Sequence, residues 1–199
     1  STSRRSFSPM QITAAASLSW LAGVAVAEPV ISEFLAVNNT SLADADGDRS
    51  DWIEIHNPDT AAVSLEGWTL TDTASKKDKW KFPAVTLEPG GYLVVFASNK
   101  NRRDPAKPLH TNFVLEGSGE YLALVRPDGV VASEFAPKFP GQFADVSYGV
   151  TQAAAETPRW GYYRTPTPGA RNGGAAALMP VERVTFSRAS GPFAGSFVL

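Results

Sequence analysis

The sequence predicts an all-β fold, a β-sandwich of about seven to nine short strands. From Pro29 onward, apolar and polar residues alternate over short runs, which is the pattern of half-buried strands and not of helices. The 199-residue chain contains 16 Gly and 15 Pro, a content that favours many turns. Hydrophobic residues make up 43% of the chain, which is enough to build a globular core.

Six stretches carry the alternating pattern. In chain order they read VISEFLAV, DWIEIHN, VSLEGWTLTD, YLVVFAS, YLALVRPDGVVASEF and VSYGV. The turn signals NPDT, EPGG and RPDG lie between or within them, and each combines residues that favour turns with the freedom of Gly or Asp. The clearest hairpin is predicted around Pro127, Asp128 and Gly129.

Composition argues against several classes of enzyme. The chain has no cysteine and therefore no disulfide, thiolate nucleophile or Cys-based zinc site. Its two histidines, His56 and His110, are too far apart for an HExxH motif, and no G-x-S-x-G nucleophile motif is present. A net charge of -2 argues against nucleic-acid binding, which needs a basic face. We therefore expect no catalytic residues in this chain.

The N-terminal segment has the layout of an export signal. Arg4 and Arg5 precede an apolar run that ends in AVA before Glu28, so residues 1–27 are predicted to be a cleaved signal peptide. The arginine pair in SRRSF also resembles the twin-arginine consensus. We expect an exported protein that is extracellular, at the cell surface or periplasmic. No transmembrane anchor is expected after cleavage.

The rest of the chain divides into three parts. Residues 28–172 hold the strand pattern and form the predicted domain. Residues 173–180 are small and almost uncharged, as in a linker. Residues 181–199 begin new strands that stop in mid-pattern, and two lone strands cannot bury an apolar face. We expect them to be the truncated start of a further β-domain.

The blocks ISEFLAVN, DADGDRSDWIEIHNP, SLEGWTLTD, KWKFP, GGYLVVFAS, LHTNF, GSGEYLALV and PTPGARNG together resemble the lamin tail domain of secreted bacterial proteins. The resemblance covers about residues 29–173 and implies an immunoglobulin-like sandwich that serves as an interaction module without catalysis. VTFSRASGPFAGSF resembles the opening of the small β-domain related to the C-terminal domain of chitobiase.

An aspartate-rich loop precedes the second predicted strand. Asp44, Asp46 and Asp48, with Gly47 among them, resemble the first half of a calcium loop, and Asp51 could add a fourth oxygen ligand. The EF-hand spacing is not kept, because Gly stands at the fourth position instead of the sixth. The alternative is a turn capped by Asp side chains that bond to nearby amides. So many close carboxylates repel one another unless a cation or a lysine lies between them.

Trp52 and a group of basic residues are the candidate ligand-binding positions. Alternation places Trp52 on the outer face of its strand, where its ring could bind carbohydrate or pack at an edge, whereas Trp68 is expected in the core. The long loop from Ser98 to Asn112 either binds a ligand or packs as a unit. The basic candidates for an anionic polymer are Lys100, Arg102 and Arg103, near the run Lys76, Lys77, Lys79 and Lys81.

These features predict a non-catalytic interaction or spacer module of a larger exported bacterial protein, with an unknown protein or polysaccharide partner. The alternative is an accessory module for polysaccharide or anionic polymer, attached to a downstream hydrolase or kinase-like domain. Structural Ca²⁺ is the one cofactor considered.

Overall fold

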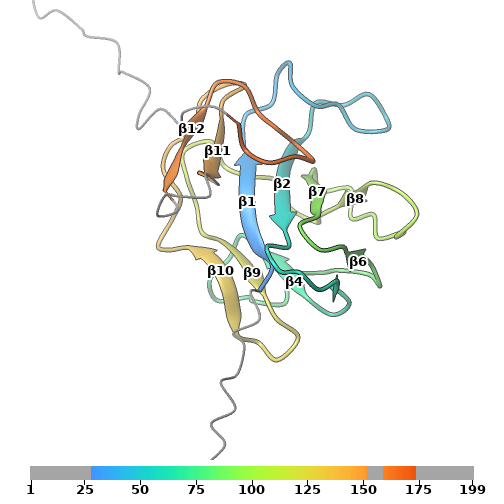
Figure 1. The fold of residues 1–199 in the computed structure, drawn as a ribbon. Coiled ribbons are helices and arrows are strands. Elements are labelled where there is room, and N and C mark those ends of the chain that lie inside the picture. The colour runs from blue at the N-terminus through green and yellow to red at the C-terminus, as the bar shows by residue number, and fades with distance from the viewer. Residues whose placement is uncertain (1–27, 152–158, 174–199) are drawn as a thin grey trace, which may run out of the picture.

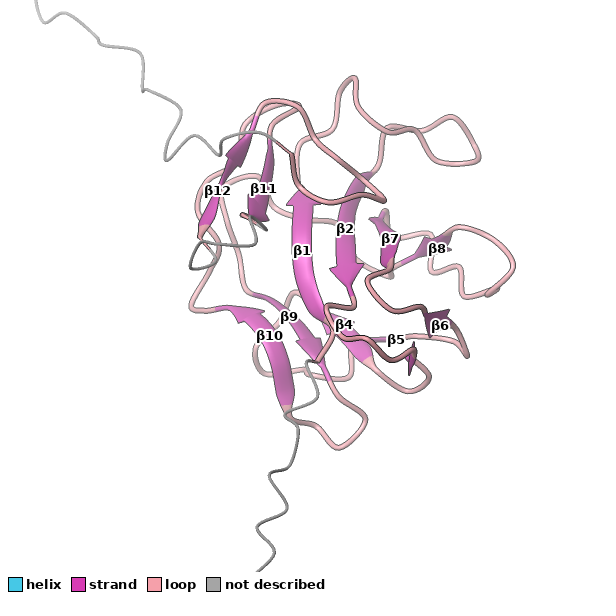
Figure 2. Cartoon of the chain, viewed as in Figure 1, coloured by secondary structure: helices cyan, strands magenta, loops and turns pink. Residues whose placement is uncertain are grey.

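The computed structural model describes residues 28–151 and 159–173. The predicted signal peptide, most of the predicted linker and the predicted further β-domain lie outside these residues. Within them every regular element is a strand, so the all-β prediction is confirmed. Figure 2 shows the strands joined only by loops and turns. Over the same residues, no helix has the length and hydrophobicity needed to cross a bilayer.

Twelve strands form three sheets (Figure 1). The larger sheet has the order β12-β11-β1-β2-β7-β8 and comprises β1 (Val30–Leu35), β2 (Asp51–His56), β7 (Tyr92–Ala97), β8 (Leu109–His110), β11 (Ser147–Val150) and β12 (Trp160–Tyr163). The second sheet has the order β10-β9-β4-β5 and comprises β4 (Thr69–Thr71), β5 (Trp80–Lys81), β9 (Leu122–Val125) and β10 (Val131–Phe135). β3 (Val63–Ser64) pairs with β6 (Thr86–Leu87). Only β7 and β8 pair in parallel among these strands.

The strands follow the predicted pattern with four additions. β5, β6, β8 and β12 lie outside the predicted stretches, and the first three contain only two residues each. Ladders this short are too brief to leave an alternating pattern in the sequence. The predicted hairpin is present as β9 and β10, with Gly129 at φ 83° and its amide bonded to the carbonyl of Arg126 at 2.9 Å.

The main core lies between the two larger sheets. Phe34 from β1 is fully buried there and its ring contacts the rings of Phe135 and Phe139, with centroids 5.2 and 4.7 Å apart. Trp80 is also fully buried and meets Phe82 edge to face. Each large apolar side chain of this kind contributes about 1.5–3 kcal/mol through burial. Trp68 is 7% exposed and belongs to the same core, as expected.

A second, smaller cluster covers the outer face of the larger sheet. Trp52 lies there with Leu35 and Phe96, and Leu42 from the loop after β1 packs against them. Alternation therefore placed Trp52 on the correct face, but its side chain is 0% exposed. The prediction that its ring could serve as a carbohydrate platform is wrong, because the preceding loop folds back over that face.

The C-terminal strap, residues 164–173, covers another part of this outer face, over β1, β2 and β11. In Figure 1 it is the orange segment near the top, in front of β1 and β2. The Asn172 amide group donates to the carbonyl of Ser32 at 3.0 Å and to that of Val150 at 2.8 Å. This explains why β1 is buried on both faces, with no fully exposed residue along it.

Candidate functional site

The aspartate loop, residues 43–50, is closed by its own first carboxylate. Asp44 Oδ1 accepts hydrogen bonds from the amides of Asp46 at 2.9 Å and Asp48 at 3.0 Å. The Asp44 amide in turn donates to the Asp48 carbonyl at 2.9 Å, and Gly47 takes φ 85° at the tip. The loop therefore has the hydrogen bonds expected of a capped turn.

A lysine from a distant loop lies at the centre of the three carboxylates. Oxygens of Asp44, Asp46 and Asp48 all lie within 4.8 Å of one another. Lys100 Nζ donates to Asp46 at 2.7 Å, to Asp48 at 2.8 Å and also to the buried Asp44. Arg102 adds a second ion pair to Asp46 at 2.7 Å. The ammonium group thus takes the central position that a metal ion would need.

These contacts set the ionisation of the cluster. Burial works against the charged form of Asp44, but hydrogen bonds from Lys100 and two loop amides outweigh it and lower its pKa. Hydrogen bonds from Arg102 and Lys100 lower the pKa of Asp46. The same carboxylates raise the pKa of Lys100 against its partial desolvation. The charges of Asp44, Asp46 and Lys100 are therefore fixed across the physiological range.

The loop that carries Lys100, residues 98–112, packs as a unit. The Asn99 amide donates to the Phe113 carbonyl at 3.1 Å, and the Asn101 amide donates to the Thr111 carbonyl at 2.9 Å. Both asparagines have positive φ, 61° and 50°, which holds Lys100 between them in a fixed direction. The loop was expected either to bind a ligand or to pack as a unit, and these contacts agree with packing as a unit.

The remaining candidate residues are not brought into one site. Asp51 is not part of the carboxylate group, since its Oδ2 accepts from the Leu115 amide at 3.3 Å. Arg103 is exposed and donates to Asn101 Oδ1 at 3.2 Å. Lys100 and Arg102 are both committed to the aspartate loop. A calcium ion at this loop would have to displace Lys100, and calcium binding stays a prediction.

A serine and a histidine meet behind this loop. Ser98 Oγ lies 2.8 Å from His110 Nδ1, and the His110 ring stacks on Phe96. His110 is 0% exposed, and its Nε2 has no hydrogen-bond partner in the described part of the chain. A catalytic dyad needs a group that orients the base, and His110 Nε2 has none among the described residues. The pair is therefore a hydrogen-bonded packing contact.

Sequence reasoning missed two buried carboxylates on the outer face of the larger sheet. Glu33 in β1 and Glu54 in β2 are paired in register, and both are 0% exposed. The strap donates to both, from Thr167 to Glu33 and from Gly169 to Glu54 at 2.7 Å. The available signal was a glutamate in the middle of each of two alternating strands, but the register that joins them is not visible in the sequence.

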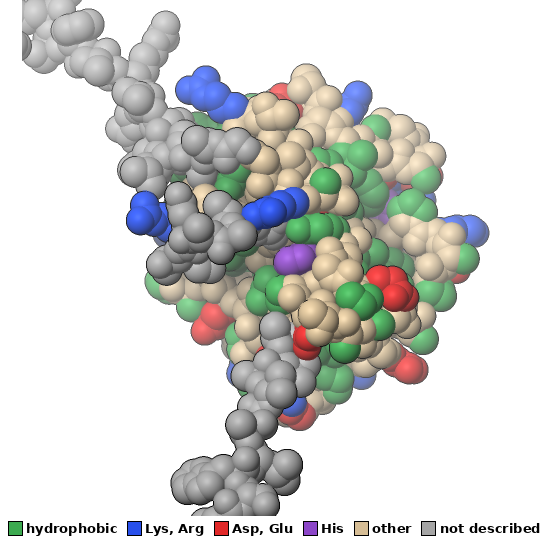
Figure 3. Space-filling model, in the orientation of Figure 1, with side chains coloured by type: hydrophobic (Ala, Val, Ile, Leu, Met, Phe, Trp, Pro, Cys, Tyr) green, Lys and Arg blue, Asp and Glu red, His purple; other side chains and the backbone are tan. Residues whose placement is uncertain are grey.

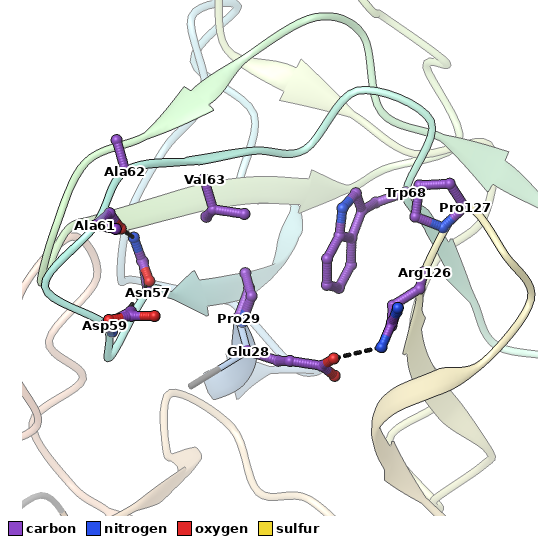
Figure 4. A pocket seen from close by; sticks show the side chains of 10 residues that line it. All are labelled: Glu28, Pro29, Asn57, Asp59, Ala61, Ala62, Val63, Trp68, Arg126 and Pro127. Carbon is purple, nitrogen blue, oxygen red and sulfur yellow. Dashed lines mark hydrogen bonds and ion pairs between the residues drawn. The ribbon is translucent and has the colours of Figure 1, made fainter. Parts of the chain in front are cut away.

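A groove of about 340 Å³ lies near the start of β1 (Figure 4). Pro29, Val63 and the edge of Trp68 form apolar walls. At one side Glu28 and Arg126 form an ion pair of 2.6 Å, drawn as a dashed line in Figure 4. This groove has apolar walls and one ion pair whose charges neutralise each other. Its lining residues do not form a set suited to acid–base or nucleophilic chemistry.

Basic residues do not gather into one patch on the face that Figure 3 shows, where the Lys and Arg side chains lie apart from one another. Of the predicted basic run, Lys79 forms an ion pair with Asp72 and lies 5.4 Å from the ring centre of Phe113. An anionic polymer would have to compete with these internal acids for Lys79, Lys100 and Arg102.

Comparison with known proteins identifies a family for this chain. The model of the Lamin Tail Domain family matches residues 25–138, more than half of the chain. No curated protein matches it. The matched range ends before β11 and β12, which complete the larger sheet. Together with the two-layer all-β architecture, the match establishes an immunoglobulin-like module of a family not known for catalysis. The chain belongs to the lamin tail domain family.

Proposed function

We propose that this domain is a non-catalytic spacer and attachment module of a larger exported bacterial protein. The observation that carries the proposal is the position of the two ends of the domain. The chain enters β1 at the bottom of Figure 1, and the strap crosses the outer face of β1 and β2 nearer the top, where Asn172 donates to the Ser32 carbonyl. After cleavage before Glu28 the domain would be the N-terminal module of the mature protein, and the strap would lead into whatever follows it.

Both ends are also fixed to the sandwich. Glu28 is held by Arg126, and Asn172 is held by two carbonyls of the larger sheet. β1 pairs with β2 on one side and with β11 on the other, so it is an internal strand. A pulling force along β1 would act parallel to its pairing with β2 and β11. Many hydrogen bonds between these strands would then have to break together.

Single-molecule stretching of the full chain between handles at its two termini tests the spacer role. We expect one discrete unfolding event that lengthens the tether by roughly 500 Å, since extended residues span about 3.3–3.6 Å each. Extension with no discrete event above the noise would contradict a spacer that resists tension.

Export is supported by the N-terminal charge and apolar pattern and is tested separately. The chain, given a start methionine, would be expressed in a bacterium and the exported protein sequenced from its N-terminus. Glu28 as the first residue would support the proposed cleavage site. Retention of residues 1–27 on a protein found only inside the cell would contradict export. The Arg4→Lys plus Arg5→Lys double variant separates the two export routes, because the twin-arginine route needs the arginine pair.

A further inference from the structure

Glu33 and Glu54 form a buried acid pair. They are direct partners across β1 and β2, and such partners have Cβ atoms about 4.5–5.5 Å apart. The register shifts at Ser32, which stands as an extra residue between the pairs of Ile31 and Glu33. This bulge lets Ser32 Oγ donate to Glu54 Oε1 at 2.5 Å. The two carboxyl groups therefore share one small polar compartment.

Within the described part of the chain, no Lys or Arg side chain neutralises this compartment. Over residues 28–151 and 159–173, neither glutamate takes part in an ion pair with Lys or Arg. The groups that face the pair are neutral. They are Ser32 from β1, Ser147 from β11, Tyr163 from β12, and Thr167, Gly169 and Ala170 from the strap.

In a buried site without a cation, the ionisation of both members of a carboxyl pair is unfavourable, because the two negative charges repel each other. Burial raises the pKa of Glu33 in spite of hydrogen bonds from Ser147 and Thr167. Burial also raises the pKa of Glu54 to about 7, and the charge of Glu33 adds to this increase. The charge of Glu33 raises the pKa of Glu54 and not the reverse, so Glu54 is the member that holds the proton.

The strap covers the pair and is attached through it. Thr167 donates to Glu33 from its amide at 3.2 Å and from its hydroxyl at 2.9 Å, and the Gly169 amide donates to Glu54 Oε2 at 2.7 Å. The strap is not a strand of either sheet, so it lacks a backbone ladder that would hold it independently. It is therefore the element that can move most easily to admit water to a second charge.

We propose that Glu33 and Glu54 share one proton at neutral pH and act as a pH-sensitive latch, which loosens the strap when that proton is lost. Water then reaches the carboxylates and the C-terminal end of the domain is released from β1 and β2. The latch is a property of the domain itself and does not depend on the spacer role.

The test is amide hydrogen exchange of Thr167 and Gly169 in the full chain, followed by NMR at pH 5.5 and pH 8.5 and corrected for the intrinsic exchange rates. We expect protection of both amides to fall at least tenfold at the higher pH. In Glu54→Gln the protection should be independent of pH, because the neutral amide keeps an oxygen for Gly169 and a donor for Ser32. Glu66→Gln, a change at an exposed position, should behave like the wild type.

Equal protection at the two pH values in the wild type would overturn the latch. So would a Glu54→Gln variant that loses protection with pH as the wild type does. If that variant does not fold, side-chain carboxyl ¹³C shifts of the wild type decide the matter. A carboxyl group that titrates near pH 7 together with the Gly169 amide signal supports the latch, whereas ionisation of both glutamates below pH 5 overturns it.

Discussion

The ammonium group of Lys100 lies 2.7 Å from the carboxylate of Asp46, across 54 residues of sequence. It also contacts Asp44 and Asp48, so one lysine joins the loop after β1 to the loop after β7. A single charged side chain therefore performs the cross-linking that an ion performs in a calcium loop. The difference is that a covalently attached cation is present at any calcium concentration.

Replacing Lys100 should convert this loop into a cation-dependent one. In Lys100→Met three carboxylates remain within 4.8 Å of one another with only Arg102 to offset them. We expect the melting temperature in chelator to fall by several degrees, since 1 kcal/mol corresponds to about 2–4 °C for a chain of this size. Millimolar calcium should restore part of the loss in the variant and change the wild type less, as measured by thermal unfolding with and without chelator.

The matched control is Lys107→Met, because Lys107 is exposed and forms an ion pair of 3.5 Å with Asp104, outside the aspartate loop. That variant should melt like the wild type in both buffers. A Lys100→Met protein whose melting is the same in calcium and chelator would show that the carboxylates do not bind calcium even when vacated.

Truncation of Trp52 should destabilise the domain without a change in ligand binding. Trp52 fills the space between Leu35, Phe96 and the covering loop. Removal of a large buried ring costs about 3–5 kcal/mol, so Trp52→Ala should lower the urea midpoint strongly. The control is Trp160→Ala, at a half-buried position on the edge strand β12. A Trp52→Ala protein of unchanged stability that lost affinity on a glycan array would mean that the ring is available to ligands after all.

Gly149 is the position where a single methyl group should displace the strap. A Cβ added there would lie 2.6 Å from Asn172 Nδ2 and 3.0 Å from the Ser32 carbonyl oxygen. We expect Gly149→Ala to break the contact between Asn172 and β1, which would raise amide exchange in the strap while the two-layer core keeps its protection. Gly141→Ala is the control, since its Cβ would meet nothing within 4 Å. Unchanged exchange in Gly149→Ala would show that the strap does not depend on this close approach.

The stability of the domain should fall as pH rises through 6, and Asp51 should contribute to this. Burial raises the pKa of Asp51 to about 6, against hydrogen bonds from Leu115 and Asn38. The folded state therefore holds this proton more tightly than the unfolded state, and the resulting stability is present below about pH 4 and lost as pH rises through 6. Asp51→Asn, which keeps an oxygen for the Leu115 amide, should flatten the dependence of the unfolding free energy between pH 4 and 7. A variant with the same slope as the wild type would contradict this assignment.

The sequence predicted what is set by local periodicity. Strand stretches, the hairpin at Gly129 and the opposite faces of Trp52 and Ile53 follow from alternation and turn chemistry, which act within a few residues. The two-residue strands β5, β6 and β8 depend instead on neighbours brought together by the fold. They leave no local pattern to find.

The sequence predicted which residues make up the candidate site, but not how these residues are arranged in space. That a lysine could separate the aspartates was one of the physical options, but which of the lysines does so depends on the path of a loop 52 residues away. In the same way, no residue next to Trp52 in the sequence predicts that Leu42 and its loop will cover the Trp52 side chain. The pairing of Glu33 with Glu54 depends on a bulge at Ser32. These are register and long-range packing effects, which a single sequence does not encode locally.

The docking of the strap on β1 also determines when the domain can finish folding. β1 lies near the beginning of the domain, yet its partners include β11, and its outer face is covered by residues 164–173. During synthesis the N-terminal strand must therefore wait for more than a hundred residues to emerge before its environment is complete. Contacts of such long range slow folding. The domain should reach its native state only after translation of its last segment, so an export route that accepts unfolded chains has time to act first.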